Sequence, residues 1–360
     1  MNVGIVGCGM ISDWYFRGAK RFAMIDISAC ADLDEDLARR KGALYGIPPV
    51  SVDRMLADPN IELVVNLTPP QAHVAVSRQI LLSGKHVYSE KPLALDLSEA
   101  EALLALAESK NLRVGCAPDS FFGGAHQALR QQVERGAVGD VLTGTVMAMS
   151  RGPEKRPNAP NHFGPGGGPM LDIGPYYVTT LIHTLGPVKR VTGFATKFSD
   201  AREGGPDTVP AVYPVAENTH YCGVLEYASG ALVTCVASYD VHAHTHPCIE
   251  LYGTEGGLQM TNPVFFQGAV KACAKGSAVW RDVENPFSYN ADARGIGVAD
   301  MIESIRVGRK HRAAGELARH ALEIMRAFDD SSRTGKSVTI QSTCERPPPL
   351  APGLADGEIA

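Results

Sequence analysis

The chain has 360 residues, of which 44% are hydrophobic and 20% charged, and its formal net charge is -5 at pH 7. This length exceeds one hydrophobic core of ordinary size and fits two domains of a globular protein. The negative charge offers no general attraction to nucleic acid or to an anionic membrane, so neither is expected as a partner.

The sequence carries no sign of export or of membrane insertion. No apolar run approaches the ~20 residues that a membrane-spanning helix needs. A strand-like pattern begins at Asn2, so we expect no signal peptide. The eight cysteines include no Cys-x-x-Cys pair. We therefore expect free thiols in a reducing, cytoplasmic location.

The first 118 residues alternate short apolar runs with amphipathic stretches. This alternation predicts right-handed βαβ units and a parallel, doubly wound Rossmann sheet. Strands are expected at residues 3–6, 27–31, 63–67, 86–88 and 113–116, and helices at residues 34–45, 71–82 and 97–109. Residues 1–118 are thus predicted to form an NAD-binding domain.

The pattern changes after residue 118. Strand-like runs rich in Thr and Val follow, and the pair Ser229-Gly230 between two of them indicates an antiparallel hairpin. Residues 119–345 are predicted to form a second domain, of the α+β class, with a mostly antiparallel, open-faced sheet and helices. Strands are expected at residues 140–150, 188–198, 221–227, 231–239 and 248–252, helices at 122–135, 169–185, 296–307 and 314–328, and loops at 152–168 and 199–214. Residues 346–360, rich in Pro and Gly, are expected to form a loosely ordered tail.

A glycine-rich turn follows the first predicted strand. Gly7 and Gly9 begin the pattern Gly-x-Gly-x-x-Ser, which departs from the full dinucleotide fingerprint at Ser12. Gly7 allows a tight turn, and Gly9 lets a pyrophosphate approach the backbone. Met10 and Ile11 lie where the next helix begins, and helix N-termini offer N–H groups to phosphate. These residues are predicted to bind a dinucleotide.

Asp32 ends the second predicted strand, where a carboxylate can accept hydrogen bonds from the adenosine ribose. Leu33 and Asp34 follow it, and no arginine is adjacent. A 2′-phosphate would face two carboxylates, which repel it. NAD is therefore predicted in preference to NADP, although Arg39 and Arg40 could approach the site from the next helix.

Lys91 follows the fourth predicted strand, and the carboxyl ends of such strands face the ligand crevice. Oxidation of a secondary alcohol needs a base for the hydroxyl proton and a positive charge near the developing alkoxide. Lys91 could supply that charge. In the alternative interpretation, Glu90 and Lys91 form a solvated surface pair.

Asp172 and Tyr176 are four residues apart and would share one face of a helix. A tyrosine beside a lysine ammonium has a lowered pKa, so Tyr176 could transfer the proton while Asp172 orients a substrate hydroxyl or Lys91. Pro175 leaves two possibilities open, because it could bend one helix that starts at Pro169 or open a second helix.

Several polar residues outside these motifs are candidates for substrate contact. His162 lies in the Gly- and Pro-rich loop, and Asp119 follows the last Rossmann strand. His242, His244 and His246 alternate, so on a strand they would share one face. Three imidazoles could ligate zinc. We expect no metal and predict substrate contact by His244 or His246 instead.

Five segments resemble the Gfo/Idh/MocA oxidoreductase family, and together they span most of the chain. They are GCGMIS from Gly7, TPPQAH from Thr68, GKHVYSEKP from Gly84, GGGPMLDIGPYY from Gly166 and YGTEG from Tyr252. The resemblance implies a Rossmann domain followed by an open-sheet domain that commonly pairs in dimers or tetramers. It implies that Lys91 is the catalytic lysine, with a bond to Pro92 that is often cis. It also places Thr68, Pro69, His73, Glu90 and Lys91 near the cofactor.

One position departs from the commonest pattern of that family. Many members have a proton-transferring histidine four residues after the aspartate, where this chain has Tyr176. The chain resembles the tyrosine-containing branch, which includes glucose–fructose oxidoreductase and dimeric dihydrodiol dehydrogenase. The histidine mechanism is therefore not carried over, and His183 is expected to be structural.

The combined motifs predict an NAD(P)-dependent oxidoreductase. It would transfer a hydride between nicotinamide and a secondary alcohol or ketone of a sugar, a cyclic polyol or a sugar derivative. The resemblance implies that the protein works as a homodimer or homotetramer, with residues 119–345 as the substrate-binding and oligomerisation domain. A redox-neutral glycosidase that holds NAD would use the same residues, so the sequence leaves that alternative open. A non-catalytic sugar or nucleotide sensor is a third possibility, which the presence of both Lys91 and Tyr176 disfavours.

Overall fold

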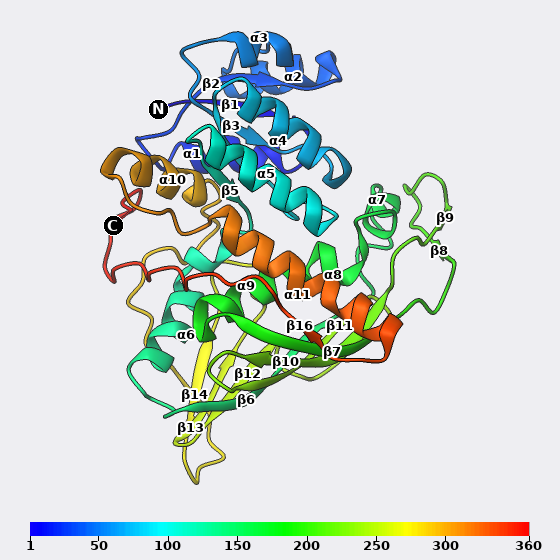
Figure 1. Ribbon diagram of the computed structural model, residues 1–360, viewed down its shortest axis with the longest axis vertical. Helices are drawn as coiled ribbons and strands as arrows, with labels where there is room; N and C mark the ends of the chain where they lie inside the picture. Colours follow the sequence, from blue (N-terminus) through cyan, green and yellow to red (C-terminus); the bar gives the residue numbers. More distant parts are fainter. Residues whose placement is uncertain (360) are drawn as a thin grey trace. The chain divides into compact units, whose positions relative to one another are not determined.

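The structure, a computed structural model, describes residues 1–359. These residues form two compact units, each described by itself (Figure 1). Unit 1 comprises Met1–Gly123, Ala291–Arg319 and the chain from Pro347 onward, and unit 2 comprises Gly124–Asn290 and His320–Arg346. Within the described residues, no helix is both long enough and apolar enough to cross a membrane.

Five parallel strands form the sheet of unit 1, in the order β2-β1-β3-β4-β5. They are β1 (Asn2–Val6), β2 (Asp26–Ala31), β3 (Leu63–Asn66), β4 (His86–Ser89) and β5 (Val114–Cys116). Every residue of β3 is buried, as in a strand covered on both faces. The strand order reverses at β1 and β3, so the ligand crevice is expected beyond the carboxyl ends of these two strands. The predicted parallel, doubly wound sheet is confirmed.

The helices of unit 1 begin and end where local chemistry favours it. They are α1 (Ser12–Ala19), α2 (Glu35–Tyr45), α3 (Val52–Ala57), α4 (His73–Leu82), α5 (Leu97–Ser109) and α10 (Ile296–Val307), with the short 3-10 helices η1 (Pro70–Ala72) and η2 (Ser120–Phe122). Asp34 caps α2 by accepting a 3.1 Å hydrogen bond from the N–H of Leu37, and Gly46, at φ 73°, ends it. The sequence missed α3, because six residues are too few to show a helical period.

Nine strands form the sheet of unit 2, in the order β15-β14-β13-β12-β6-β11-β10-β7-β16. Neighbours pair antiparallel, except β6 and β11, which are parallel. The strands are β6 (Val141–Met149), β7 (Val188–Thr196), β10 (His220–Tyr227), β11 (Leu232–Ser238), β12 (Ile249–Gly253), β13 (Gly256–Met260), β14 (Val270–Ala274), β15 (Arg281–Asp282) and β16 (Val338–Thr339). The predicted, mostly antiparallel sheet is confirmed.

Helices cover one face of this sheet and bury its apolar side chains. They include α6 (Gly124–Glu134), α8 (Gly168–Asp172), α9 (Gly174–Leu185) and the part of α11 (Gly315–Thr334) that belongs to unit 2. Close packing is visible at Gly193 of β7, where an added Cβ would lie 2.6 Å from the ring of Phe328 on α11. Glycine at that position therefore lets the helix approach the sheet.

Of the two possibilities that Pro175 left open for residues 169–185, the second helix is observed and the single bent helix is wrong. α8 ends at Asp172 and α9 begins at Gly174, with Ile173 between them. Pro175 lies in the first turn of α9, where its missing N–H interrupts no helical hydrogen bond. Asp172 and Tyr176 therefore belong to different helices, and helical spacing does not place them on one face.

Both segments expected as loops contain regular structure. The short helix α7 (Ala159–Phe163) lies in the first, and β8 (Ala201–Glu203) pairs with β9 (Val212–Pro214) in the second. Arg202 of β8 is buried, pairs with the carboxylates of Glu154, at 2.9 Å, and Asp240, and lies 5.2 Å from the ring centre of Phe163. A buried charge with two partners fixes this ribbon to the rest of unit 2.

The tail is bound to unit 1 rather than loosely ordered, although it forms no regular secondary structure. The carbonyl oxygens of Pro348 and Pro349 accept hydrogen bonds from the guanidinium of Arg312 at 2.9 and 3.2 Å. Asp356 accepts a 3.0 Å hydrogen bond from Arg21. Because Arg312 is itself paired with the buried carboxylate of Asp300, the tail packs on an ordered support.

Candidate active site

The glycine-rich turn of unit 1 has the geometry that a dinucleotide requires. Gly7 has φ 96°, and an added Cβ would lie 2.6 Å from the carbonyl group of Leu67 at the end of β3. Glycine is therefore required where β1 and β3 diverge. A Cβ on Gly9 would meet no atom within 4 Å, which leaves space above the backbone. Ser12 is buried and its Oγ donates to the Gly9 carbonyl at 2.7 Å, which closes the first turn of α1.

Asp32 lies at the end of β2, beside this turn. One carboxylate oxygen accepts from the N–H of Cys8 at 2.7 Å and the other from the N–H of Asp34 at 2.9 Å. These bonds fix the carboxylate without using all of its acceptor positions. Two predicted contacts are exposed here, Met10 at 65% and Leu33 at 98%. The open backbone, the helix N-terminus and the fixed carboxylate fit the phosphates and ribose of NAD.

The two arginines that could favour a 2′-phosphate have carboxylate partners on or before α2. Arg39 pairs with Asp36 and, at 3.3 Å, with Glu35. Arg40 lies 3.8 Å from Asp34, in an exposed pair. Exposed pairs of this kind contribute little, so Arg40 is held only weakly.

His73 joins the segment after β3 to the segment after Lys91. Its Nε2 lies 2.7 Å from the carbonyl oxygen of Thr68, and its Nδ1 lies 2.7 Å from the carbonyl oxygen of Pro92. Burial lowers the pKa of His73, so the neutral ring donates to one carbonyl at a time. The hydroxyl of Thr68 also donates a 2.7 Å hydrogen bond to the side-chain oxygen of the buried Asn66. Pro69 directly precedes η1.

Glu90 is buried, at 9% exposure, and accepts a 2.9 Å hydrogen bond from the hydroxyl of Tyr15 on α1. Its other carboxylate oxygen accepts from the N–H of Lys91 at 3.1 Å. This arrangement does not match a solvated surface pair. The Lys91–Pro92 peptide bond is cis, and Lys91 itself is half-buried at the carboxyl edge of the sheet.

The carboxylate of Asp119 is engaged with the start of α10. Its Oδ2 accepts from the N–H groups of Gly295, at 3.1 Å, and Gly297, at 3.4 Å. Burial raises the pKa of Asp119 to about 7, while the nearby Arg294 opposes this shift. The structure thus gives Asp119 a helix-capping contact, and its predicted contact with substrate stays a prediction.

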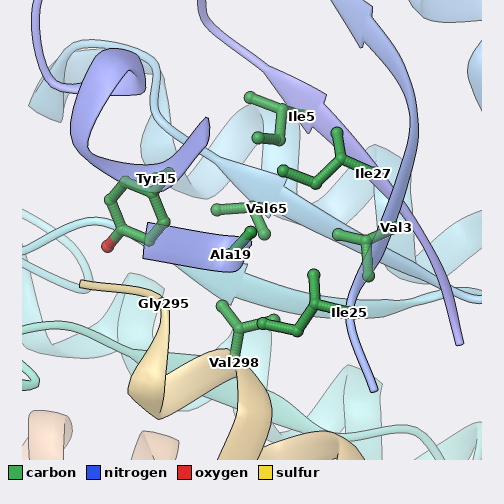
Figure 2. A pocket seen from close by; sticks show the side chains of 9 residues that line it. All are labelled: Val3, Ile5, Tyr15, Ala19, Ile25, Ile27, Val65, Gly295 and Val298. Atoms are coloured by element: carbon green, nitrogen blue, oxygen red, sulfur yellow. The ribbon is translucent and has the colours of Figure 1, made fainter. Parts of the chain in front are cut away.

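An apolar pocket also lies within unit 1 (Figure 2). In Figure 2 the hydroxyl of Tyr15 points away from the aliphatic side chains around it. No other polar side chain lines the pocket, so it offers no chemistry. It is lined by Val3, Ile5, Tyr15, Ala19, Ile25, Ile27, Val65, Gly295 and Val298.

In unit 2, Asp172 is the centre of a cluster of polar side chains. Its Oδ2 lies 2.9 Å from Nδ1 of His162 on α7 and accepts a 2.6 Å hydrogen bond from the hydroxyl of Tyr239, directly after β11. Asn158, at the start of α7, lies with its Nδ2 3.2 Å from Nε2 of His162. Burial raises the pKa of Tyr239, and the carboxylate of Asp172 raises it further. The phenol therefore stays protonated and donates the hydrogen bond to Asp172.

Tyr176 lies in the first turn of α9 and is half-buried. Its backbone N–H donates to the carbonyl oxygen of Ile173 at 3.1 Å, and its own carbonyl oxygen accepts from the hydroxyl of Thr180 at 2.6 Å. The phenol is close enough to Tyr239 to act on it electrostatically. Tyr176 is therefore a neighbour of the Asp172 cluster.

The remaining histidine candidates lie elsewhere. His244 and His246 are exposed, with ring centres 6.3 Å apart, and their segment is not a strand. The condition under which the alternating histidines would share one face, a strand at this place, is therefore not met. Among residues 1–359, no group of His, Cys, Asp or Glu is arranged to hold a metal ion. His183 is fully buried between Gln127, at 3.2 Å, and Arg130, at 3.1 Å, in a structural role.

Sequence reasoning missed three residues that hold the candidate side chains. Tyr239 and Tyr15 each meet a carboxylate that is distant in sequence, by 67 and 75 residues respectively. No local pattern indicates such a pair. Asn158 precedes His162 by one helical turn, a spacing that could have indicated contact if α7 had been recognised.

The parallel sheet, the glycine turn and the acidic residue after β2 define a Rossmann-fold oxidoreductase. Residues 1–117 match the family model described as "Oxidoreductase family, NAD-binding Rossmann fold". Residues 126–259 match that of the "GFO/IDH/MocA C-terminal domain". The chain belongs to the Gfo/Idh/MocA oxidoreductase family. The resemblance seen in the sequence, the oxidoreductase class and NAD as cofactor are thus confirmed.

Three curated relatives illustrate the range of similarity. An uncharacterized oxidoreductase of Schizosaccharomyces pombe is 35% identical over 39% of this chain and 38% of its own length. The dTDP-3,4-didehydro-2,6-dideoxy-alpha-D-glucose 3-reductase of Saccharopolyspora spinosa is 27% identical over 77% of this chain and 80% of its length. The D-xylose 1-dehydrogenase (NADP(+)) 2 of Haloferax volcanii is 25% identical over 94% of this chain and 100% of its length.

A solved structure shows the same fold. Levoglucosan dehydrogenase in complex with NADH and levoglucosan superposes with a TM-score of 0.79 over 95% of this chain and 100% of that chain, at 19% identity.

Proposed function

We propose that the protein is an NAD-dependent dehydrogenase or reductase acting on a secondary alcohol or ketone of a sugar, a cyclic polyol or a sugar derivative. The observation that carries the proposal is the Asp172 carboxylate, held by His162 and Tyr239, in a chain whose other unit is an NAD-binding oxidoreductase domain. Polar side chains of fixed direction are what a polyhydroxylated substrate requires. The named activities of the relatives also concern sugars.

Lys91, Asp172 and Tyr176 are the proposed catalytic residues. NAD accepts or returns the hydride when bound. The ammonium of Lys91 would stabilise the developing alkoxide, and Asp172 would orient the reacting hydroxyl. The sequence assigns the proton to Tyr176, although His162 is a second group of the same unit that can exchange one. His244 and His246 are kept as proposed substrate contacts, as is Asp119.

Cofactor binding is assigned to residues 1–118 and substrate binding to residues 119–345. Gly7, Gly9, Met10 and Ile11 would contact the pyrophosphate, and Asp32 with Leu33 the adenosine ribose. Thr68, Pro69, His73 and Glu90 would line or support the site near the nicotinamide. NAD is proposed over NADP, because Asp32 and Asp34 would face a 2′-phosphate.

A homodimer or homotetramer that pairs through the open sheet face of unit 2 is also proposed. The strand registers place Phe194, Val224, Leu232 and Tyr252 on one face, and all four are exposed. Exposed apolar side chains on a sheet face, here beside the Arg190–Glu226 ion pair, support an interface at that face. A cytoplasmic location is proposed because all eight cysteines are free thiols, as in reducing compartments.

The decisive experiment is an absorbance screen with NAD and a panel of sugars, inositols, sugar acids and glycosides. We expect NADH to accumulate with at least one sugar or polyol. Release of aglycone from a glycoside without net NADH would instead identify the redox-neutral alternative. Inactivity with the whole panel, in a protein that still binds NAD, would contradict the proposed substrate class.

A further inference from the structure

The hydrogen bond between Tyr15 and Glu90 connects the helix after the glycine turn to the strand end that carries Lys91. We propose that Tyr15 is a positioning residue, which holds the backbone of Lys91 in place by orienting the carboxylate of Glu90. This inference rests on the oxidoreductase activity proposed above and adds a residue of α1 to that site. All three residues belong to unit 1.

Each oxygen of the Glu90 carboxylate binds a different donor. Oε1 accepts from the hydroxyl of Tyr15 at 2.9 Å, and Oε2 accepts from the backbone N–H of Lys91 at 3.1 Å. The second bond joins adjacent residues, and a glutamate side chain loses much rotamer freedom when it is fixed. The bond from Tyr15, which is 75 residues away in sequence, therefore selects the rotamer in which Oε2 meets Lys91.

Buried packing fixes the phenol that holds Glu90. Tyr15 is only 2% exposed, and its ring lines the apolar pocket together with Val3 and Ile5. Its hydroxyl points away from these aliphatic side chains (Figure 2). Burial raises the pKa of Tyr15, and the charge of Glu90 raises it further, so the phenol stays protonated and donates. A donor locked by packing can hold a carboxylate in one direction.

Other contacts hold the backbone on either side of Lys91. The N–H of Glu90 donates to the carbonyl oxygen of Asn66, at the end of β3, at 2.8 Å. Nδ1 of His73 lies 2.7 Å from the carbonyl oxygen of Pro92. The Glu90 side chain then holds the N–H of Lys91 itself. Of these three contacts, the last is the one that a side chain of α1 supports.

This link matters because α1 is the helix whose first turn is expected to bind the pyrophosphate. Ser12 closes that turn through its 2.7 Å hydrogen bond to the carbonyl oxygen of Gly9, and Tyr15 lies one helical turn further on. The link from α1 therefore fixes the backbone of Lys91 relative to the expected cofactor site. Small displacements of a catalytic group slow a reaction strongly. Tyr15 would thus affect turnover without touching the substrate.

Amide hydrogen exchange of the purified protein, without cofactor or substrate, tests this link directly. The amide of Lys91 is followed in peptides that span residues 89–95, where Pro92 contributes no amide. Tyr15→Phe should speed the exchange of the Lys91 amide by at least about 10-fold, as expected when a hydrogen bond to a charged group is lost. Exchange in β3 should stay as in the wild-type protein.

Tyr45→Phe is the matched control for this measurement. It also removes a phenol that donates a 2.9 Å hydrogen bond to a carboxylate, that of Asp13, and it should leave residues 89–95 unchanged. Unchanged exchange of the Lys91 amide in Tyr15→Phe would overturn the inference. Equal acceleration in β3 would also overturn it, because the substitution would then have loosened the sheet as a whole.

Turnover then tests the role, with D-xylose, levoglucosan and myo-inositol as probes and NAD as oxidant, well below the unfolding temperature of each variant. Tyr15→Phe should lower kcat about 10-fold, because Lys91 stays present but is less well placed. The KM values, and the affinity for NADH measured by fluorescence, should change by less than about 2-fold, since no binding contact is removed. Tyr45→Phe should keep the wild-type kcat.

A double-mutant cycle shows whether Tyr15 acts through Glu90. Glu90→Gln leaves one acceptor oxygen in place of two and should lower kcat at least as much as Tyr15→Phe, and the double variant should lose no more. Losses that multiply, or a wild-type kcat in Tyr15→Phe, would refute the inference and leave the proposed function intact. If the wild-type protein oxidises no probe, the proposed function fails, and amide exchange alone decides whether Tyr15 holds Lys91.

Discussion

The hydroxyl of Tyr15 donates a 2.9 Å hydrogen bond to the buried carboxylate of Glu90, which links the helix after the glycine turn to the residue before Lys91. Tyr15→Phe would leave that carboxylate with one partner fewer in a buried site. The free energy of unfolding should fall by about 1–3 kcal/mol. Chemical denaturation measures this loss. Tyr45→Phe is the control, because Asp13 keeps Lys41 as a partner, and an equal loss in both variants would contradict the explanation.

Lys91→Ala should lower turnover with any substrate that the wild-type protein accepts. Removing one group that stabilises an oxyanion typically costs about 10²- to 10³-fold in kcat. Binding of NADH should stay within a few-fold of the wild-type value, because the adenosine and pyrophosphate contacts remain. Steady-state kinetics with a fluorescence titration of NADH separate the two. Turnover at the wild-type level would refute the assigned role.

Asp32 should control the choice of cofactor. Asp32→Ser removes the carboxylate beside the expected ribose, and losing a hydrogen bond to a charged group costs about 1.5–3 kcal/mol. The affinity for NAD should fall by that amount, and the ratio of NADP to NAD efficiency should rise. Asp36→Asn changes a nearby exposed carboxylate on α2 and serves as the control. Higher efficiency of the wild-type protein with NADP would contradict the preference.

Asp119 should make the protein less stable as the pH rises. Its pKa is raised to about 7 in the folded protein, whereas an unfolded Asp titrates near 3.9. Between these values the folded state binds the extra proton, so stability falls as pH rises from about 4 to about 7. Asp119→Asn keeps an oxygen acceptor for Gly295 and should remove this slope. Thermal unfolding of both proteins across this range shows the difference, and parallel curves would disprove it.

A charge on the open sheet face of unit 2 should break the proposed oligomer. Phe194→Asp replaces an exposed apolar side chain of the proposed interface by a carboxylate, and burying an unpaired charge at an interface is strongly unfavourable. The mass measured by light scattering should fall to that of one chain. Leu44→Asp changes an exposed leucine on α2 and is the control. A wild-type protein that is already monomeric would rule out the pairing.

Much of the fold could be predicted because its patterns are local. The strands of unit 1 are short, apolar and evenly spaced, and Leu97–Ser109 shows a full helical period with Asp96 as its cap. The helix break at Ile173 could not be decided, since Pro175 suits both a bend and a first turn. Strands β13 to β15 and the β8–β9 ribbon were missed, because their identity depends on the strands beside them.

The candidate site was only partly predictable for the same reason. Lys91 and Asp172 lie in motifs whose residues are neighbours in sequence. The contacts that fix Asp172 come from α7 and from the end of β11, and neither reveals in its own sequence which carboxylate it will meet. The pairing of His162 with Asp172 is set by packing around Phe163, which only the folded chain shows.

Unit 1 is assembled from segments that are distant in the sequence, and this affects how the protein can fold during its synthesis. All strands of its parallel sheet have been translated once Cys116 is made. The N–H group of Gly295, which binds Asp119, lies in a segment translated some 170 residues later. The Asp300–Arg312 pair lies in the same late segment. A ribosome that has released only the first 123 residues thus presents a sheet without α10. We expect such a fragment to be a poor stand-alone nucleotide-binding module, so that cofactor capture waits for nearly the whole polypeptide.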